Sequence, residues 1–225
     1  MSIADKSFDQ AAWDYLFLLD RGYPQAPSLA LVGDRYRLDR SGRNLLRRGI
    51  ADSASAARRR DLLVSEVRGR HLVVDGHNVI LTVANYLAGK TPFLANDGLL
   101  RDDGALHGRL HDESLMERSL VRLAGKLLDC EAASVRVVLD QPLSHSGDHA
   151  ETLRRLVTRR ASITVTLEHS ADGALKRSGA EVIASADSAV VDACGKAVWD
   201  LARSALEHSF ALDIPDFSQY LSSDG

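Results

Sequence analysis

A change of hydrophobic period near residue 70 is the feature that most limits the fold of this 225-residue chain. Beyond it, short runs rich in β-branched residues alternate with longer segments whose apolar residues recur at helical spacing. The runs are 71–74, 135–139, 163–167 and 181–184. Near-continuous apolar strands separated by helices predict an α/β domain with a mainly parallel sheet, helices on both faces and right-handed connections.

The segments between these runs predict helices over 79–87, 112–128, 147–160, 172–178, 188–194 and 196–208. One interruption, residues 91–101, predicts a β-hairpin that turns on Asp97-Gly98. The charged residues Asp97, Arg101, Asp102 and Asp103 fall in or next to this hairpin. Turn chemistry explains Asp97 best, and a further ligand or a substrate-facing loop is the alternative for the group.

The first part of the chain has a different character. Residues 10–65 show helical spacing throughout, with breaks at Pro24, Pro27 and 38–42. We therefore divide the chain into a small all-α module at 1–68, the α/β domain at 69–212 and a loop-like tail at 213–225. Residues 1–70 contain 13 Lys and Arg against 9 Asp and Glu, whereas residues 71–225 contain 15 against 22. This asymmetry indicates that the two parts have different roles.

Arginine supplies the positive charge of the helical module. Positions 35–70 contain eleven arginines and no lysine. Because the planar guanidinium group suits phosphate oxygens, we expect this surface to hold a nucleic-acid backbone, and we assign Arg43, Arg47 and Arg48 to substrate binding. Arginines that only solvate exposed helix faces explain the pattern about equally well, so that alternative stays open.

Several classes of protein are excluded by what the sequence lacks. No apolar run is long enough to span a bilayer, so we expect no membrane partner. The first 17 residues mix charged with apolar residues, which is unlike a secretory signal, and we expect a cytoplasmic protein. The two cysteines form no zinc-site spacing. The nucleotide-binding patterns G-x-x-x-x-G-K-[ST] and G-x-G-x-x-G are absent.

An aspartate follows each predicted strand. Asp75 and Asp140 end the first two runs, Asp172 comes shortly after the third, and Asp187 follows the fourth. Each alone is more simply a helix N-cap, but parallel strands place all four at one edge of the sheet. Carboxylates so close repel one another unless a cation neutralises them, and Mg²⁺ or Mn²⁺ takes such oxygen ligands. We therefore predict a divalent metal centre that activates water for phosphodiester hydrolysis.

Other polar residues near this edge are weaker candidates. Asn78 is expected to hold a carboxylate or the substrate, or to serve as an ordinary cap. Ser146 is expected to cap the next helix and to leave N–H groups for a phosphate, although a plain cap needs no ligand. The pairs His107/His111 and His145/His149 have the i, i+4 spacing of transition-metal ligands, but such pairs without further ligands are weak signals.

Three motifs resemble those of PIN-like nucleases, including their NYN branch. They are Asp75-Gly76-x-Asn78 after the first strand, Asp172 opening a later helix, and the segment 183–188 around Asp187. The resemblance covers about residues 70–195 and implies a Rossmann-like sheet, Mg²⁺ or Mn²⁺, RNA cleavage, and metal roles for Asp75, Asp172 and Asp187, with Asp140 as a fourth member. The sequence departs from the pattern in two places: residues 79–88 contain no acid, and Ala189 replaces a second aspartate.

A second resemblance covers nearly the whole chain. Residues 19–24, 31–36, 75–78, 97–102, 140–147 and 185–187 are similar to an uncharacterised prokaryotic family, domain-of-unknown-function family four-three-four. This family implies no activity.

Together these features predict a cytoplasmic, metal-dependent ribonuclease of PIN-like type with an Arg-rich helical module that holds nucleic acid, RNA rather than DNA. The main alternative is a catalytically inactive protein of the same fold that binds nucleic acid or another partner. A third hypothesis is another phosphate chemistry at the same edge, such as a phosphatase. A homo-oligomer is compatible with the sequence.

Overall fold

The structure is a computed structural model that describes residues 6–102 and 112–221. The chain divides into two compact units. The helical unit comprises 1–61, 91–105 and 213–225, and the sheet unit comprises 62–90 and 106–212. Each unit therefore contains segments that are far apart in the sequence. No helix among the described residues is both long and apolar enough to cross a membrane.

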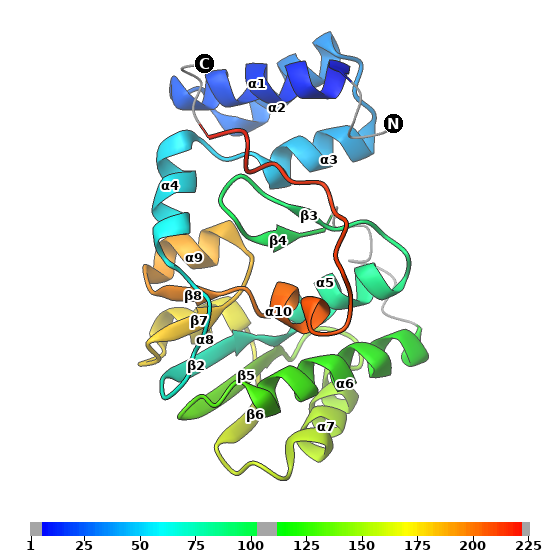
Figure 1. The fold of residues 1–225 in the computed structure, drawn as a ribbon, viewed down its shortest axis with the longest axis vertical. Coiled ribbons are helices and arrows are strands. Elements are labelled where there is room, and N and C mark those ends of the chain that lie inside the picture. The colour runs from blue at the N-terminus through cyan, green and yellow to red at the C-terminus, as the bar shows by residue number, and fades with distance from the viewer. Residues whose placement is uncertain (1–5, 103–111, 222–225) are drawn as a thin grey trace. The chain divides into compact units, whose positions relative to one another are not determined.

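A six-stranded sheet forms the centre of the sheet unit (Figure 1). Every pair of neighbouring strands is parallel, and Val73 of the central strand aligns with Arg136 on one side and Ile183 on the other. In spatial order the strands are β1 (Leu63–Val64), β8 (Ala197–Trp199), β7 (Val182–Ala184), β2 (His71–Asp75), β5 (Ser134–Asp140) and β6 (Ile163–Glu168). The predicted parallel α/β architecture is confirmed.

The strand order fixes where the helices lie. The chain steps outward from β2 to β5 and β6, then crosses to β7 and steps outward the opposite way to β8. With right-handed connections, helices of the first series cover one face and those of the second cover the other. The first series is α5 (Gly76–Leu87), α6 (Glu113–Asp129) and α7 (Ser146–Val157), and the second is α8 (Ala171–Arg177) and α9 (Ser188–Cys194). The last helix, α10 (Leu201–Glu207), packs against α5 and α6.

The direction of the connections reverses between β2 and β7. In open α/β sheets, the crevice at such a switch point, beyond the carboxyl ends of the strands, is the usual place for a ligand. Asp75 ends β2 at this point, and residues 185–187 follow β7. The topology therefore makes the carboxyl edge of these two strands the expected place for a functional site.

The edge strand β1 and its neighbour β8 were not predicted. Each has only two or three residues, too few for a period to show. Residues 196–208 were predicted as one helix, but Ala197–Trp199 pair with β7, and α10 begins only after Asp200, whose side chain accepts a hydrogen bond from Arg203 N. The helical spacing seen up to residue 65 also extends past the last helix of this region, which ends at Asp61, because Leu63–Val64 pair with β8.

The helical unit contains four helices, a hairpin and the C-terminal segment. The helices are α1 (Lys6–Asp20), α2 (Gln25–Arg35), α3 (Arg40–Gly49) and α4 (Ser53–Asp61), and the hairpin pairs β3 (Phe93–Leu94) with β4 (Leu100–Arg101). Pro27 lies in the first turn of α2, where its missing N–H has no intrahelical acceptor to lose. The Asp39 side chain caps α3 by accepting a hydrogen bond from Gly42 N.

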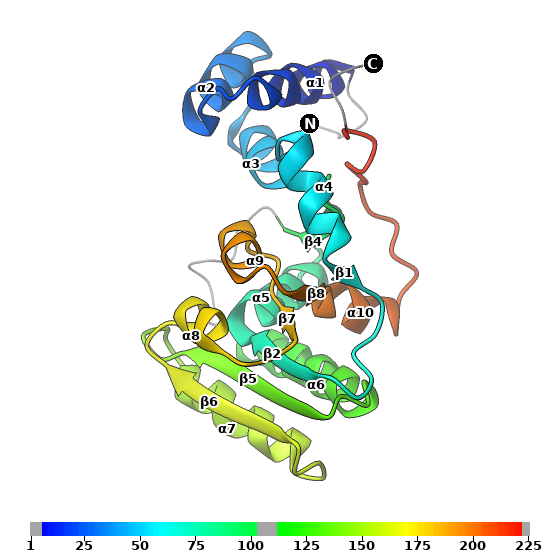
Figure 2. The ribbon, with the colours of Figure 1, turned by 90° about the vertical axis from the view of Figure 1, so that its left-hand side faces the viewer.

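The hairpin and the C-terminal segment complete the core of the helical unit. Phe93, Phe217 and Tyr220 are buried among apolar residues of α1, α2 and α3. Leu94 N donates to Pro215 O and Phe217 N donates to Leu94 O, so residues 215–217 lie beside Leu94 of β3. The sequence does not predict that these aromatic rings are buried, because the contacts that bury them join distant parts of the chain. Figure 2 shows the C-terminal segment in red.

Buried polar residues of the hairpin fix its position. The Asn96 amide bonds both the N–H and the C=O of Ala51 and the C=O of Tyr220. The Asp97 carboxylate is fully buried, and Arg101 donates to both of its oxygens, at 2.8 and 2.7 Å. Arg59 donates to it at 3.1 Å. Although burial alone would raise the pKa of Asp97, the two guanidinium groups outweigh it and hold the pKa below its usual value.

Asp97→Asn should destabilise the helical unit strongly. It leaves the buried guanidinium groups of Arg59 and Arg101 without a compensating charge, a change that typically costs about 3–5 kcal/mol. The control is Asp34→Asn, which breaks the exposed pair with Arg43 and should cost less than about 1 kcal/mol. Urea denaturation measures both. Equal losses in the two variants would contradict a structural role for the buried ion group.

Candidate functional site

The switch point is built around hydrogen bonds between β2 and the loop after β7. Ser185 Oγ donates to Asp75 Oδ2 at 3.0 Å, and Asp187 N donates to Ser185 Oγ at 3.2 Å. Asn78 Oδ1 accepts a hydrogen bond from Ala186 N at 2.9 Å. These bonds hold the end of β2, the start of α5 and the loop before α9 as one structure.

Asp75 is the central and most buried of the candidate residues. It caps α5, because Oδ1 accepts a hydrogen bond from Asn78 N at 3.3 Å. Burial raises the pKa of Asp75 from 3.8 to about 7, against the lowering effect of the Ser185 and Asn78 hydrogen bonds. The negative charges of Asp140 and Asp172 raise this pKa further. A carboxyl group whose pKa is raised to near 7 in this way is typical of functional sites. Structural networks of charged groups also contain carboxyl groups with shifted pKa values.

Asp140 and Asp172 come from neighbouring elements of the same edge. Asp140 ends β5, and its Oδ1 accepts a hydrogen bond from Ala171 N at 2.8 Å, which fixes the start of α8. Asp172 lies in the first turn of α8, whose cap is Ser170 rather than Asp172. The pKa of Asp172 is raised, first by burial and then by the negative charge of Asp187, with a smaller contribution from Asp140. The positive charge of Lys176 acts against this shift.

Asp187 completes the group from the other side of the switch point. It caps α9, with Oδ1 accepting hydrogen bonds from Ala189 N and Val190 N at 2.8 and 3.3 Å. The structure therefore brings Asp75, Asp140, Asp172 and Asp187 to one edge, where their charges act on one another. Asp75 and Asp187 both serve as N-caps, and a capping carboxylate keeps lone pairs for a further ligand, so the cap does not exclude a metal role.

The carboxylates do not form a ready-made cage for a metal ion. Across residues 6–102 and 112–221, no three or more His, Cys, Asp or Glu side chains are grouped so that they could hold one ion. Mg²⁺ needs fewer protein ligands, because it is usually bound by one or two carboxylates with water and substrate phosphate. The chemistry of the four donors fits that kind of site, and their metal role stays a prediction.

His77 was missed in the sequence, although it stands between Gly76 and Asn78. It is buried, and its Nδ1 accepts a hydrogen bond from Asp140 N at 3.0 Å. Burial lowers its pKa to about 4, against the Asp140 carboxylate, which raises it. The ring is therefore neutral at neutral pH, so its 3.6 Å approach to Asp140 Oδ2 is not an ion pair. Through this hydrogen bond His77 fixes the backbone of Asp140, a role that the sequence alone does not predict.

Gly76 was expected to allow the close approach of a ligand or of another backbone. The structure shows the second: a Cβ at this position would lie 2.9 Å from Val138 O and 2.5 Å from Leu139 Cδ2. Glycine thus lets the start of α5 pack directly on β5. A larger residue would push Asp75 away from Asp140.

The prediction for Ser146 as a helix cap is wrong. His145 occupies the cap position of α7 and makes no side-chain cap bond, while Ser146 is the first helical residue and donates its hydroxyl to Gln141 O at 3.0 Å. The hydroxyl is therefore used to fix the loop after β5. A phosphate role for Ser146 stays a prediction.

The arginines assigned to substrate binding lie in the helical unit. Arg43 donates to Asp34 Oδ1 at 2.7 Å, and Arg48 donates to Asp102 O at 2.5 Å. Arg47 lies in the last turn of α3. Arg43 and Arg48 therefore have structural partners, which gives their positive charge an explanation without nucleic acid. Their role in substrate binding stays a prediction.

The structure describes one of the two histidine pairs that have the spacing of transition-metal ligands. His107 and His111, together with Asp103 of the hairpin group, lie outside the described residues. The rings of His145 and His149 have centroids 6.5 Å apart, and the His149 ring lies 5.9 Å from that of His77. His145 Nδ1 is 3.4 Å from Asp148 Oδ2. Of the second pair, therefore, His149 packs against His77, and His145 packs against His149.

Asp75→Asn should change how stability depends on pH. Because the folded-state pKa of Asp75 is raised to about 7, the folded protein binds this proton more tightly than the unfolded chain. This stabilisation is complete below about pH 4 and is lost as pH rises through about 7, with a slope of at most about 1.4 kcal/mol per pH unit. The variant does not titrate here and keeps an acceptor for Asn78 N.

Urea denaturation between about pH 4 and pH 8 measures this difference. The variant should gain free energy of unfolding relative to the wild type as pH rises, and the difference should become constant above about pH 8. Parallel profiles for the two proteins would show that Asp75 does not titrate in this range.

Comparisons with known proteins divide the chain near residue 62, several residues before the boundary at 68/69 that the sequence suggested. Residues 7–61 match the family described as a protein of unknown function (DUF434), and residues 64–204 match the domain of unknown function (DUF5616). The resemblance that we attributed to family four-three-four over nearly the whole chain is thus confirmed for its first part, and the remainder matches a different family. An uncharacterized protein of Methanocaldococcus jannaschii is 26% identical over 207 residues, which cover 90% of this chain and 98% of that protein.

No solved structure matches the chain. The second family model covers more than half of the chain, from β1 to α10, and contains all four aspartates of the candidate site. The chain therefore belongs to the DUF5616 family.

Proposed function

We propose that the protein is a Mg²⁺- or Mn²⁺-dependent ribonuclease of PIN-like type, acting at the carboxyl edge of the sheet. The observation that carries the proposal is the convergence of Asp75, Asp140, Asp172 and Asp187 at the switch point, where two of them have raised pKa values. Uncompensated negative charge is costly to hold together, and a divalent cation is the natural compensation. The resemblance of the three motifs to PIN-like nucleases supports the same conclusion.

Three of the four carboxylates are held by the protein in a defined orientation. Asp75 is fixed by Asn78 N and Ser185 Oγ, Asp140 by Ala171 N, and Asp187 by the first N–H groups of α9. A carboxylate oxygen has two lone pairs, so an oxygen that accepts one hydrogen bond can still be a ligand. Ligands held in this way keep their geometry while substrate enters and leaves.

A bound divalent cation would supply an activated water and would stabilise charge on the phosphate. The Asn78 amide nitrogen makes no hydrogen bond within the described part of the chain and would donate to a phosphate oxygen. Arg43, Arg47 and Arg48 would hold the nucleic-acid backbone, without reading its sequence.

A second candidate is a protein of the same fold that binds nucleic acid or another partner without cleaving it. Its support is the missing metal cage within the described residues, together with the absence of acidic residues from α5 and the presence of Ala189. The two candidates differ in turnover, so the same assay separates them. A phosphatase would instead hydrolyse a small phosphomonoester.

Cleavage of labelled single-stranded and structured RNA in the presence of Mn²⁺ or Mg²⁺ tests the proposal. We expect cleavage by the wild type, complete inhibition by EDTA, and a loss of at least about 100-fold in Asp75→Asn and Asp187→Asn. The control is Asp148→Asn, which removes an exposed carboxylate of α7 and should keep full activity. A folded wild type that is as inert as both variants would overturn the nuclease and leave the binding protein.

A further inference from the structure

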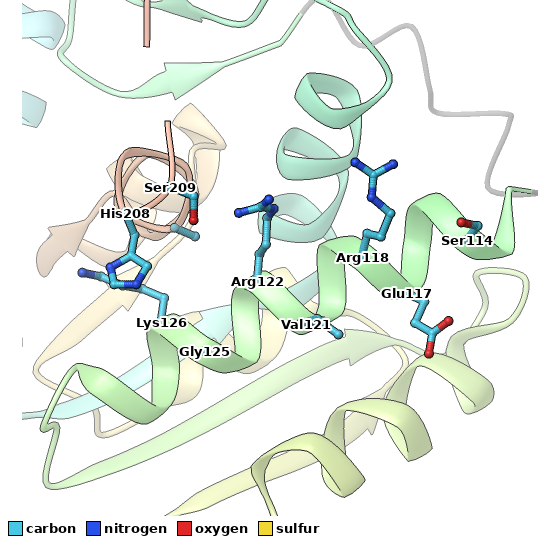
Figure 3. Close-up of a pocket in the computed structure, with 10 residues that line it drawn as sticks. Ser114, Glu117, Arg118, Val121, Arg122, Gly125, Lys126, His208 and Ser209 are labelled. Atoms are coloured by element: carbon cyan, nitrogen blue, oxygen red, sulfur yellow. The ribbon is translucent and has the colours of Figure 1, made fainter. Parts of the chain in front are cut away.

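The sheet unit has a cationic groove between α6 and α10 (Figure 3). Its volume is about 490 Å³, within the range of sites that bind small ligands. None of the four aspartates of the candidate site lines it. Its lining residues are Ser114, Glu117, Arg118, Val121, Arg122, Gly125, Lys126, Ala205, His208 and Ser209.

Three cations form one row along the groove. Arg118, Arg122 and Lys126 are spaced by four residues on α6, so each is displaced from the next by about 6 Å along the helix. Figure 3 shows the guanidinium groups of Arg118 and Arg122 on the same side of the helix and Glu117 pointing away from them. Within residues 6–102 and 112–221, none of these three cations forms an ion pair with a carboxylate.

Aromatic rings, rather than acids, hold two of the cations in place. The Arg122 guanidinium lies 4.5 Å from the centroid of the Phe210 ring, and Lys126 Nζ lies 5.9 Å from that of Trp199. A cation held by a ring keeps its charge available to an anion, whereas a cation paired with a carboxylate does not. The row therefore presents positive charge that aromatic rings hold in place at Arg122 and Lys126.

Apolar and small residues lie beside the row. Val121 is 49% exposed, and a Cβ at Gly125 would meet no atom within 4 Å. Ala205 lines the opposite side of the groove, from α10. This combination of a row of cations and an open apolar surface is complementary to a chain of regularly spaced phosphates that also carries flat, apolar bases.

We propose that this groove binds single-stranded nucleic acid, with Arg118, Arg122 and Lys126 on successive phosphates and a base or sugar against Val121 and Gly125. The inference deepens the proposed function, and it rests on that function only for the choice of polymer. A phosphodiester chain fits better than an acidic peptide, because the charges repeat along one helix face and the apolar surface lies beside them. The groove is a second contact surface, separate in its residues from the Arg-rich helical module.

Fluorescence anisotropy with a labelled oligouridylate of about twelve nucleotides tests this inference, in EDTA so that no cleavage occurs. Arg118→Gln with Arg122→Gln should weaken binding by roughly tenfold or more and should reduce the slope of log K against log salt by about 1–2. The control, Arg155→Gln with Arg159→Gln, removes the same charge from exposed positions of the sheet unit outside the groove and should change neither value appreciably.

A further variant tests the groove without changing its charge. Gly125→Leu fills the open space beside the row, and it should weaken binding while the salt slope stays as in the wild type. Thermal melting of every variant shows that it is folded. Equal losses in the groove and control variants, or no loss in either, would overturn the inference.

Two competitors identify the ligand. Uridine monophosphate should compete far more weakly than the oligonucleotide, and poly-glutamate should compete weakly at matched charge. Equal competition by either would overturn binding of a nucleic-acid chain. Binding through the groove without any cleavage in Mn²⁺ would leave this inference standing while the nuclease fails. Cleavage by the wild type, together with unchanged binding by the groove variants, would support the nuclease and overturn this inference.

Discussion

Negative charge gathered at the switch point is the constraint on which the candidate site depends. Asp75 is buried at the end of β2, and three further aspartates reach the same edge from β5, α8 and the start of α9. Within residues 6–102 and 112–221, no arginine or lysine forms an ion pair with Asp75 or Asp187. Instead the protein orients the carboxylates with backbone N–H groups and one hydroxyl, and the pKa of Asp75 rises. This contrasts with Asp97 in the helical unit, where two guanidinium groups compensate a buried carboxylate fully.

Much of the sheet unit could be predicted from the sequence. Strands β2, β5 and β6 and the shorter β7 lie in apolar runs that the sequence shows. A parallel sheet places the residues that follow such strands at one edge, so the convergence of four aspartates followed from topology alone. The details that needed the structure involve short or distant contacts. Strands β1 and β8 are too short to show a period, and the hydrogen bond from Asp140 N to His77 joins residues 63 positions apart. The cap of α7 was misplaced because the Ser146 hydroxyl bonds the preceding loop.

The helical unit was harder to predict, for a physical reason. Its core depends on Phe93 and Phe217, which pack against the helices but lie far from them in the sequence. Its arginines also serve two purposes that composition cannot separate. Arg59 compensates Asp97 inside the unit and Arg43 pairs with Asp34 at its surface, so a high arginine content does not by itself indicate nucleic acid. In contrast, the row on α6 comprises only three cations, and it is notable because they lack acidic partners in the described residues.

The most direct test of the central claim is to locate Mn²⁺ by its anomalous scattering in crystals grown with the ion at about neutral pH. The account predicts a peak within coordination distance of oxygens from at least two of the residues Asp75, Asp140, Asp172 and Asp187. A structure in which these carboxylates are ordered and Mn²⁺ is bound elsewhere, or not bound at all, would contradict it. The edge would then be a structural arrangement of helix caps rather than a metal centre.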